Sequence, residues 1–183
     1  MADQERRVFL TVGTTRFDAL VEAVDRAAVA AVLRRRGYTH LTMQIGAAAF
    51  QGSRLLPAGA MRGALPDGLV VEWFDYSPSL AAHVAGAALV VSHAGAGSVF
   101  EALVAGVPVV AVPNPQLMDD HQAELARKLE GAGVLVAATL GTLEHVLATA
   151  DFQGLESYVP GDPGGMVAAV DWLMGVGSAA GKK

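Results

Sequence analysis

The sequence contains no cysteine, and this absence excludes several kinds of chemistry. Without thiols the chain can form no disulfide framework, no thiolate metal site and no cysteine nucleophile. Long hydrophobic runs are also missing: 52% of the residues are apolar, yet no run approaches the roughly eighteen uncharged residues that a membrane-spanning helix needs. The apolar run after the N-terminus is too short for a signal peptide, so we expect a cytoplasmic protein.

Positive charge is scarce as well. The formal net charge is -5, whereas a nucleic-acid-binding protein carries a basic face. The basic run Arg34–Arg36 is typical of the exposed end of a helix, where cations interact favourably with the helix dipole. We therefore expect no nucleic-acid partner.

Strand-like apolar runs alternate with helix-like segments along most of the chain. The strand-like runs cover residues 7–12, 40–45, 69–74, 88–92, 106–114 and 134–139. Helical spacing is found at 17–36, 77–87, 98–105, 117–133, 142–150 and 164–175. The stretch 46–68 is rich in Gly, Pro and Ala and predicts a long loop. Because the strands are continuous Val-rich runs, we expect a doubly wound α/β fold whose parallel sheet is covered on both faces.

The length of the chain fits one domain. We expect this domain over residues 1–175, ending in a C-terminal helix, and a disordered tail at 176–183. Ser77 is the expected N-cap of the helix that follows the third strand. Ligands of such sheets bind at the carboxyl ends of the strands, which places loops 13–17, 46–52 and 92–98 together on one edge.

The segment SHAGAGSVFEAL, residues 92–103, carries the strongest signal for a site. A buried strand runs into a turn with glycines at 95 and 97 and then into a helix. Glycines let a ligand approach the backbone, and a helix start offers unpaired N–H groups, so a phosphate is the expected ligand. A tight strand-to-helix turn without any ligand would use the same residues.

Three familiar sites do not fit this turn. The dinucleotide fingerprint requires a small residue where the chain has Phe100, and no Lys followed by Ser or Thr supports a P-loop. Ser98 does not stand in the Gly-x-Ser-x-Gly elbow of serine hydrolases. We therefore expect neither a nicotinamide cofactor, nor ATP hydrolysis, nor serine hydrolase chemistry.

Polar side chains follow the glycine turn and a later strand. Glu101 is placed to accept hydrogen bonds from sugar hydroxyls, although a surface glutamate near the start of a helix would look the same. Asp119, Asp120, His121 and Gln122 open another helix and suit a hydroxylated ligand. Their spacing matches no standard metal motif, so we expect no metal site.

Four segments occur together in a characteristic order and spacing: VFLTVGTTRFDALV, LTMQIG, LVVSHAGAGSVFEALVAGVPVVAVPNPQLMDDHQAELARKL and GVLVAAT. They resemble the soluble catalytic subunit of the two-part enzyme that adds the second N-acetylglucosamine to the dolichol-linked precursor of N-glycans. The resemblance, which implies a glycosyltransferase family 28 C-terminal domain, extends from Arg7 to about Leu147. That family is similar to the donor-binding half of the bacterial lipid-linked glycosyltransferase of peptidoglycan synthesis, a Rossmann-like GT-B architecture.

The resemblance implies UDP-N-acetylglucosamine as the donor substrate and no cofactor. The residues implied to surround its diphosphate are Gly13, Thr14, Thr15, Gly95, Ala96, Gly97 and Ser98. Glu101 would take the ribose hydroxyls, while His121 and Gln122, with Asp120 beside them, would face the sugar. His93 is either a general base or a structural histidine bonded to nearby backbone.

One departure from the family pattern concerns the loop after MQIG. Family members often carry Arg-Gly there, whereas this chain has Ala47 and Ala48. The departure removes the reason to expect a basic contact to phosphate from that loop. It leaves the glycine turn and the Asp-x-His-Gln segment untouched.

The resemblance also implies an enzyme that is active only as a complex. A GT-B enzyme closes two domains around its substrates, and this chain supplies one. A membrane-anchored subunit would bind the acceptor, dolichyl-diphosphate-N-acetylglucosamine, and recruit this chain to the cytosolic face of the endoplasmic reticulum. Transfer would be inverting and independent of metal, because backbone N–H groups can stabilise the leaving UDP and the chain has no Asp-x-Asp motif.

Two other functions remain open at this point. The soluble half of a bacterial-type two-component exopolysaccharide glycosyltransferase has a similar pattern and would use another UDP-sugar. A non-catalytic nucleotide-sugar-binding subunit would have no turnover of its own. The C-terminal segment MVAAVDWLMGV, residues 166–176, has an apolar surface that would pack either on the domain's own core or against a partner.

Overall fold

The computed structural model describes residues 5–116 and 121–159. Its strands are β1 (Arg7–Thr11), β2 (His40–Gln44), β3 (Arg62–Ala64), β4 (Val70–Phe74), β5 (Leu89–Ser92), β6 (Val109–Ala111) and β7 (Val136–Ala137). Its helices are α1 (Asp18–Val24), α2 (Ala27–Arg35), α3 (Ala81–Ala85), α4 (Ala96–Val104), α5 (His121–Gly131) and α6 (Leu143–Thr149). None of the described helices is long and apolar enough to cross a membrane.

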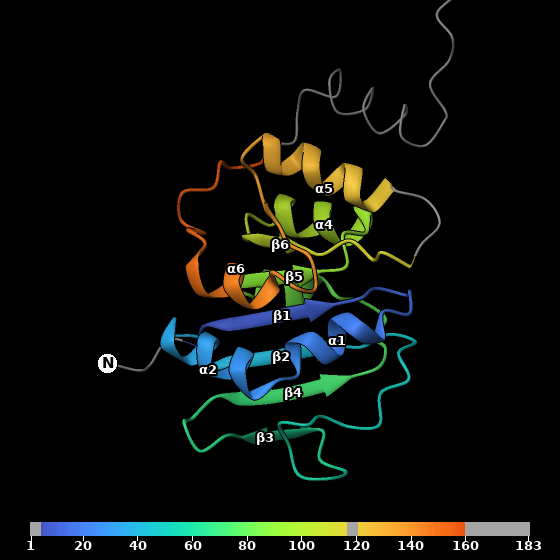
Figure 1. The fold of residues 1–183 in the computed structure, drawn as a ribbon, viewed down its shortest axis with the longest axis vertical. Helices are drawn as coiled ribbons and strands as arrows, with labels where there is room; N and C mark the ends of the chain where they lie inside the picture. Colours follow the sequence, from blue (N-terminus) through green and yellow to red (C-terminus); the bar gives the residue numbers. More distant parts are fainter. Residues whose placement is uncertain (1–4, 117–120, 160–183) are drawn as a thin grey trace, which may run out of the picture.

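The strands form one sheet in the order β3-β4-β2-β1-β5-β6-β7 (Figure 1). Neighbouring strands are parallel except at the edge, where β3 runs antiparallel to β4. The chain builds outward from β1 to β2 and β4, then returns to the other side of β1 with β5. The order therefore reverses between β1 and β5, which confirms the expected doubly wound α/β fold.

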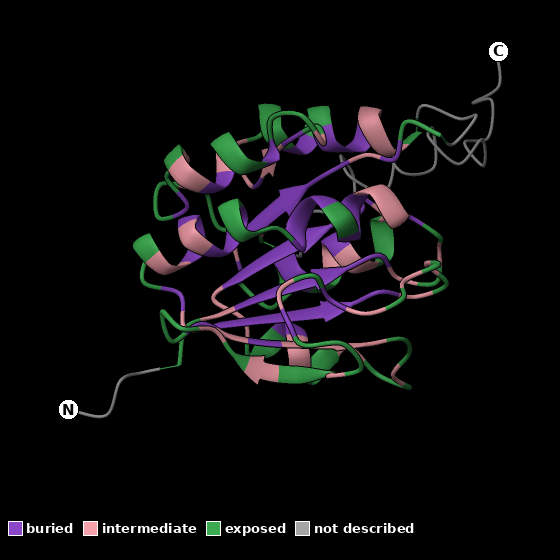
Figure 2. Cartoon of the chain, turned by 60° about the horizontal axis from the view of Figure 1, so that its bottom comes forward, coloured by how far each residue is buried: buried purple, intermediate pink, exposed green. Residues whose placement is uncertain are grey.

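Helices cover both faces of the sheet, and each face has its own hydrophobic core. Alternate residues of β1 enter different cores: Val8 and Leu10 pack with α1, α2 and α6, whereas Phe9 packs with α3, α4 and α5. Figure 2 shows the buried strands between helices whose outer sides are exposed. Burial on both faces is why the strands appear in the sequence as continuous apolar runs rather than alternating ones.

The expected helix over 17–36 is interrupted, and this prediction was wrong in detail. The chain leaves α1 at Asp25, whose side chain is buried and accepts hydrogen bonds from Ser53 Oγ at 2.5 Å and from the Arg54 N–H at 2.7 Å. The carboxylate thus anchors the long loop after β2 to the helical layer. Apolar spacing continues across the break, so periodicity alone did not reveal it.

Two further differences lie around β4. The stretch 46–68, expected to be a loop throughout, contains β3, which pairs with β4 through the turn at Gly68. Helix α3 begins at Ala81, so Ser77 does not cap it. The expected C-terminal helix at 164–175 and the tail at 176–183 lie outside the described residues, as does Asp120.

Candidate functional site

A cavity of about 570 Å³ opens at the carboxyl ends of β1, β2, β4 and β5, where the strand order reverses. We call it the main cavity. It is lined by Gly13, Thr14, Gln44, Tyr76, Ser77, Pro78, Ser79, Leu80, His93, Gly95, Gly97, Ser98 and Glu101. The structure therefore brings together the glycine turn, the first loop and Glu101, as the sequence predicted. Nothing from 46–52 lines this cavity. The loop does begin at the same edge of the sheet, as expected, where the Gly46 N–H donates to the Asp75 carbonyl at 3.0 Å, and Ala48 packs against the hydrophobic core.

The N-terminus of α4 forms one wall of this cavity. Gly95 is the N-cap residue, with extended backbone and no side chain to accept a hydrogen bond from the first turn. Gly97 and Ser98, in that first turn, line the cavity. A Cβ added at Gly97 would meet no atom within 4 Å. This wall is open and offers the unpaired N–H groups and partial positive charge that favour an anion.

His93 fills the space between the two glycine loops. A Cβ added at Gly95 would overlap the His93 imidazole, and one at Gly13 would lie 2.9 Å from its Cε1 atom. Gly13 also has a φ of +61°, which few side chains tolerate. These two glycines are therefore required by the histidine ring, whereas Gly97 is not.

The environment of His93 favours its neutral form. The residue is 6% exposed, and its Nδ1 atom is buried with no hydrogen-bond partner among the described residues. Burial lowers the pKa of the imidazole, and the neighbouring Thr11 carbonyl acts in the opposite direction. The next residue, Ala94, is 1% exposed and has a φ of +60°, so the turn also holds an alanine in the left-handed region.

Gln44 is a cavity residue that the sequence analysis missed. Its side-chain amide is 1% exposed and bonds to the loop after β1 and to the end of β4. It is the last residue of β2, at the carboxyl edge of the sheet. That position was the available signal, because residues at the carboxyl ends of the strands of such a sheet lie at the edge where ligands bind.

The loop after β4, residues 75–80, contributes Tyr76 and the four residues after it to the cavity lining and was also missed. Tyr76 is 72% exposed there, and Ser77 lines the cavity rather than capping α3. Its signal was again the carboxyl end of a strand. Strand order was needed to see that β4 lies close enough to β1 and β5 for its loop to reach them.

Other predicted residues lie outside the cavity or form hydrogen bonds to the backbone. Thr15 Oγ1 donates to the Val12 carbonyl at 2.7 Å and closes the first loop. Ala96 begins α4 but is not among the residues that line the cavity. His121 is exposed at the start of α5 and lines neither this cavity nor the next.

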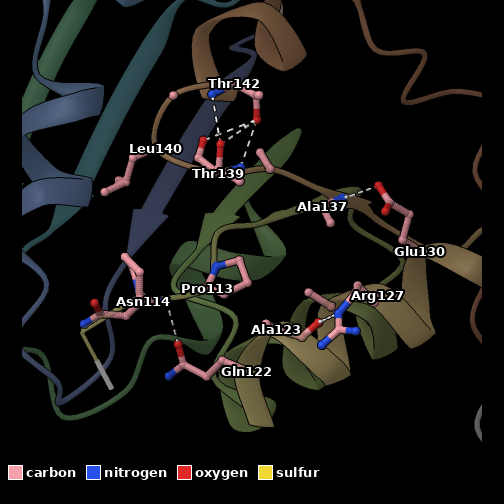
Figure 3. Close-up of a pocket in the computed structure, with 14 residues that line it drawn as sticks. Pro113, Asn114, Gln122, Ala123, Arg127, Glu130, Ala137, Thr139, Leu140 and Thr142 are labelled. Carbon is pink, nitrogen blue, oxygen red and sulfur yellow. Dashed lines mark hydrogen bonds between the residues drawn. The ribbon is translucent and has the colours of Figure 1, made fainter. Parts of the chain in front are cut away.

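Gln122 lies in a second cavity of about 600 Å³, between α5 and the loop before α6 (Figure 3). Its Oε1 atom accepts a hydrogen bond from the Asn114 N–H at 3.0 Å, and Figure 3 shows the side chain turned toward Asn114. Asn114 in turn donates to the Arg16 carbonyl at 3.4 Å, in the loop after β1. Gln122 thus supports the strand end next to the main cavity, and its contact with a sugar stays a prediction.

No group of three or more His, Asp or Glu side chains within residues 5–116 and 121–159 is arranged to hold a metal ion. The polar groups that the described residues bring to the main cavity are backbone N–H groups, several hydroxyls, the Gln44 amide, the His93 imidazole and the Glu101 carboxylate. Such a set suits a ligand that combines an anion with hydroxyl groups.

Comparison with known proteins gives a consistent picture. The glycosyltransferase family 28 C-terminal domain matches residues 7–158. A UDP-N-acetylglucosamine transferase subunit, ALG13 of Mus musculus, is 38% identical over 138 residues, covering 75% of this chain but only 11% of that protein.

Two solved structures share the fold. The solution structure of ALG13 superposes with a TM-score of 0.66 at 23% identity, covering 93% of this chain and 96% of that one. The crystal structure of MurG from Acinetobacter baumannii superposes with a TM-score of 0.62 at 23% identity, covering 85% and 44%. These likenesses confirm the expected Rossmann-like fold of a GT-B half.

Proposed function

Because the chain belongs to the glycosyltransferase family 28 C-terminal domain family, we propose that its main cavity binds UDP-N-acetylglucosamine as the donor in a glycosyl transfer. The observation that carries the proposal is the convergence of Gly13, Gly97 and Glu101 on one cavity where the strand order reverses. Open α/β sheets bind nucleotides at this position. The name of the mouse relative supports N-acetylglucosamine as the transferred sugar.

In the proposed complex the diphosphate lies against the first turn of α4. Gly97 leaves room there, and the N–H groups of this turn have no capping side chain. As the glycosidic bond breaks, negative charge grows on UDP, and these fixed N–H groups stabilise it without reorganising. Glu101, further along the helix, accepts hydrogen bonds from the ribose hydroxyls. The reaction so drawn needs no cofactor.

The chemical step is an inverting displacement. The acceptor hydroxyl oxygen bonds to the anomeric carbon, UDP leaves with the electron pair of the broken bond, and a base takes the hydroxyl proton. We assign this base to a partner subunit, because His93 is 6% exposed and its ring is enclosed between Gly13 and Gly95. His93 then acts as a spacer that holds the two loops apart.

The acceptor side is assigned to the same partner. A GT-B enzyme needs a second domain to complete its cleft, and the word subunit in the name of the mouse relative supports such an assembly. We propose that the partner is anchored in the membrane, binds dolichyl-diphosphate-N-acetylglucosamine and recruits this chain to the cytosolic face of the endoplasmic reticulum.

The test is transfer from UDP-N-acetylglucosamine to a lipid-diphosphate N-acetylglucosamine acceptor, measured with this chain alone and with the partner co-expressed. We expect product only in the paired reaction. A Glu101→Ala chain, paired in the same way, is the matched control and should give less product. A folded chain that forms the complex and binds UDP, yet transfers no N-acetylglucosamine, would overturn the choice of sugar; a chain that does not bind UDP would overturn the donor site itself.

A further inference from the structure

Gln44 is buried in the floor of the main cavity with every polar group of its side chain in use. Its Oε1 atom accepts hydrogen bonds from Thr11 Oγ1 at 2.7 Å and from the Gly13 N–H at 3.1 Å. Its Nε2 atom donates to the carbonyl oxygens of Gly13 at 2.9 Å and of Asp75 at 3.0 Å. Two acceptor positions and two donor hydrogens are the whole capacity of a carboxamide.

The partners of this amide also determine its orientation. The Gly13 N–H can only donate, so it must face the amide oxygen, and the two carbonyls can only accept, so they must face the amide nitrogen. The network is satisfied by a glutamine in one orientation and by no carboxylate. The residue is therefore specified by its neighbours and not by burial alone.

The groups that Gln44 joins belong to two walls of the cavity. Gly13 lies in the loop after β1, and Asp75 begins the loop after β4, next to the cavity residue Tyr76. Strand β2 lies between β1 and β4 in the sheet, and Gln44 pairs with Thr11 on one side and Phe74 on the other. One side chain thus bridges both neighbouring strand ends.

The same point is tightly packed around the Gly13 carbonyl. A Cβ added at Gly46 would lie 2.7 Å from that oxygen, and the Gly46 N–H donates to the Asp75 carbonyl at 3.0 Å. The loops after three adjacent strands therefore meet at this place. A change in the Gln44 amide would move the first glycine loop relative to the loop at 75–80.

We propose that Gln44 is a positioning residue for the donor, which sets the separation of the Gly13 loop and the Tyr76 loop so that both reach the same ligand. This inference rests on the proposed function of the cavity. Because its amide is saturated, Gln44 itself has no hydrogen bond left for the donor. It acts through the two loops, in the way that supporting hydrogen bonds hold a binding constellation in its productive geometry.

Two substitutions remove different sets of the hydrogen bonds of this amide. Gln44→Glu has the same shape and can still accept from Thr11 Oγ1 and the Gly13 N–H, but it places an oxygen against the carbonyls of Gly13 and Asp75. Gln44→Met keeps the length and removes all four bonds without adding charge beside an anionic ligand. Thr42→Val is the matched control: Thr42 is also fully buried on β2, but its hydroxyl bonds to Glu72 and Arg7 away from the cavity.

The experiment is calorimetric titration of the full-length chain and its variants with UDP, well below the melting temperature of each. We expect both Gln44 variants to bind at one site per chain with affinity weakened about ten-fold or more, since loops displaced from their geometry lose contacts with the ligand. Thr42→Val should bind as the wild type does, even where its melting temperature falls.

The outcomes are distinct. A purely structural role for Gln44 would reduce the number of binding sites through unfolded chain and leave the affinity of the folded fraction unchanged, and that result would overturn the inference. If both Gln44 variants bound UDP with the affinity of the wild type, the inference would be overturned as well. Failure of the wild-type chain to bind UDP would instead overturn the donor site on which the inference rests.

Discussion

Gly95 and Gly97 stand two residues apart in one turn, yet they lack side chains for different reasons. At Gly95 the His93 ring occupies the position of a Cβ, so Gly95→Ala should lower the free energy of unfolding by about 1–3 kcal/mol, the usual cost of overpacking. Gly97 has open space, and alanine is the better helix former by up to about 1 kcal/mol, so Gly97→Ala should fold at least as well as the wild type.

The ligand should respond differently from the fold. In Gly97→Ala the added methyl group enters the space proposed for the diphosphate, so UDP affinity should fall about ten-fold through lost hydrogen bonds to the helix start. Urea unfolding and calorimetric titration of both variants measure the two effects separately. A Gly97→Ala chain with normal UDP affinity would place the diphosphate elsewhere.

His93 gives the chain a predictable dependence on pH. Burial lowers its pKa in the folded state below the usual value of about 6.5, so the unfolded chain binds more protons in the interval between the two values. The stability associated with neutral His93 is complete above about pH 6.5 and is lost as the pH falls toward the folded-state pKa.

This pH dependence can be measured with a ring that does not titrate. We expect the wild-type chain to lose more stability than His93→Phe between neutral pH and about pH 5, as measured by urea unfolding at each pH. Equal losses in the two proteins would mean that His93 is protonated as readily in the folded chain as in the unfolded one.

Among residues 5–116 and 121–159, Glu101 is the only carboxylate that lines the main cavity. If it accepts hydrogen bonds from the ribose, Glu101→Ala should weaken UDP binding by about 1.5–3 kcal/mol, the range for a hydrogen bond to a charged group. A ribose that lacks a donating hydroxyl provides the control: 2′-deoxy-UDP should bind the wild type more weakly than UDP, and its affinity should fall less on mutation. If the mutation lowered the affinity for both nucleotides equally, Glu101 would not bind the ribose hydroxyl.

At the scale of elements, the anchoring of the loop after β2 depends on one buried carboxylate. Asp25 accepts from Ser53 and Arg54, so Asp25→Ala leaves a buried hydroxyl and an amide N–H without these bonds. We expect a loss of about 1–3 kcal/mol in the free energy of unfolding. Because this loop does not line the main cavity, UDP affinity should not change. An altered affinity would show that the loop reaches the ligand.

The order of strands and helices was predictable, while some boundaries were not. The Val-rich runs of β1 and β5 indicated strands buried on both faces, because that burial leaves no polar alternation. The break at Asp25 and the short strand β3 were missed. The break depends on a contact with Ser53, which is far away in sequence. Strand β3 has three residues and pairs with β4 in a local hairpin, so it is too short to show a strand period of its own.

Some residues of the site were predictable from the sequence and others were not. Gly95 and Gly97 were predictable because a glycine turn between a strand and a helix has a local physical meaning. Gln44 and Tyr76 were not, because their importance arises from the neighbourhood of β4, β2 and β1 in the sheet. Spacing along the chain does not contain strand order, and the helix expected at 77–87 concealed a loop that lines the cavity.

At the scale of the whole molecule, the cavity is built on the central strands of the sheet, between the two cores. Its walls come from loops that follow β1, β4 and β5, and each of these strands is hydrogen-bonded to a neighbour. A ligand held between such loops should stabilise the fold as a unit. The linkage is quantitative: a ligand at about 100 times its dissociation constant adds about 2.7 kcal/mol to the free energy of unfolding.

Stabilisation by ligands can show which part of the nucleotide contacts α4. UDP and UMP share base and ribose and differ in the β-phosphate, which we place at the first turn of α4. At equal concentrations, UDP should therefore raise the melting temperature of the full-length chain more than UMP does, because it alone reaches the helix N-terminus. In Gly97→Ala this difference should shrink, while the effect of UMP should change little. Equal stabilisation by UDP and UMP in the wild type would mean that α4 does not bind the diphosphate and that the charge of the leaving group is stabilised elsewhere.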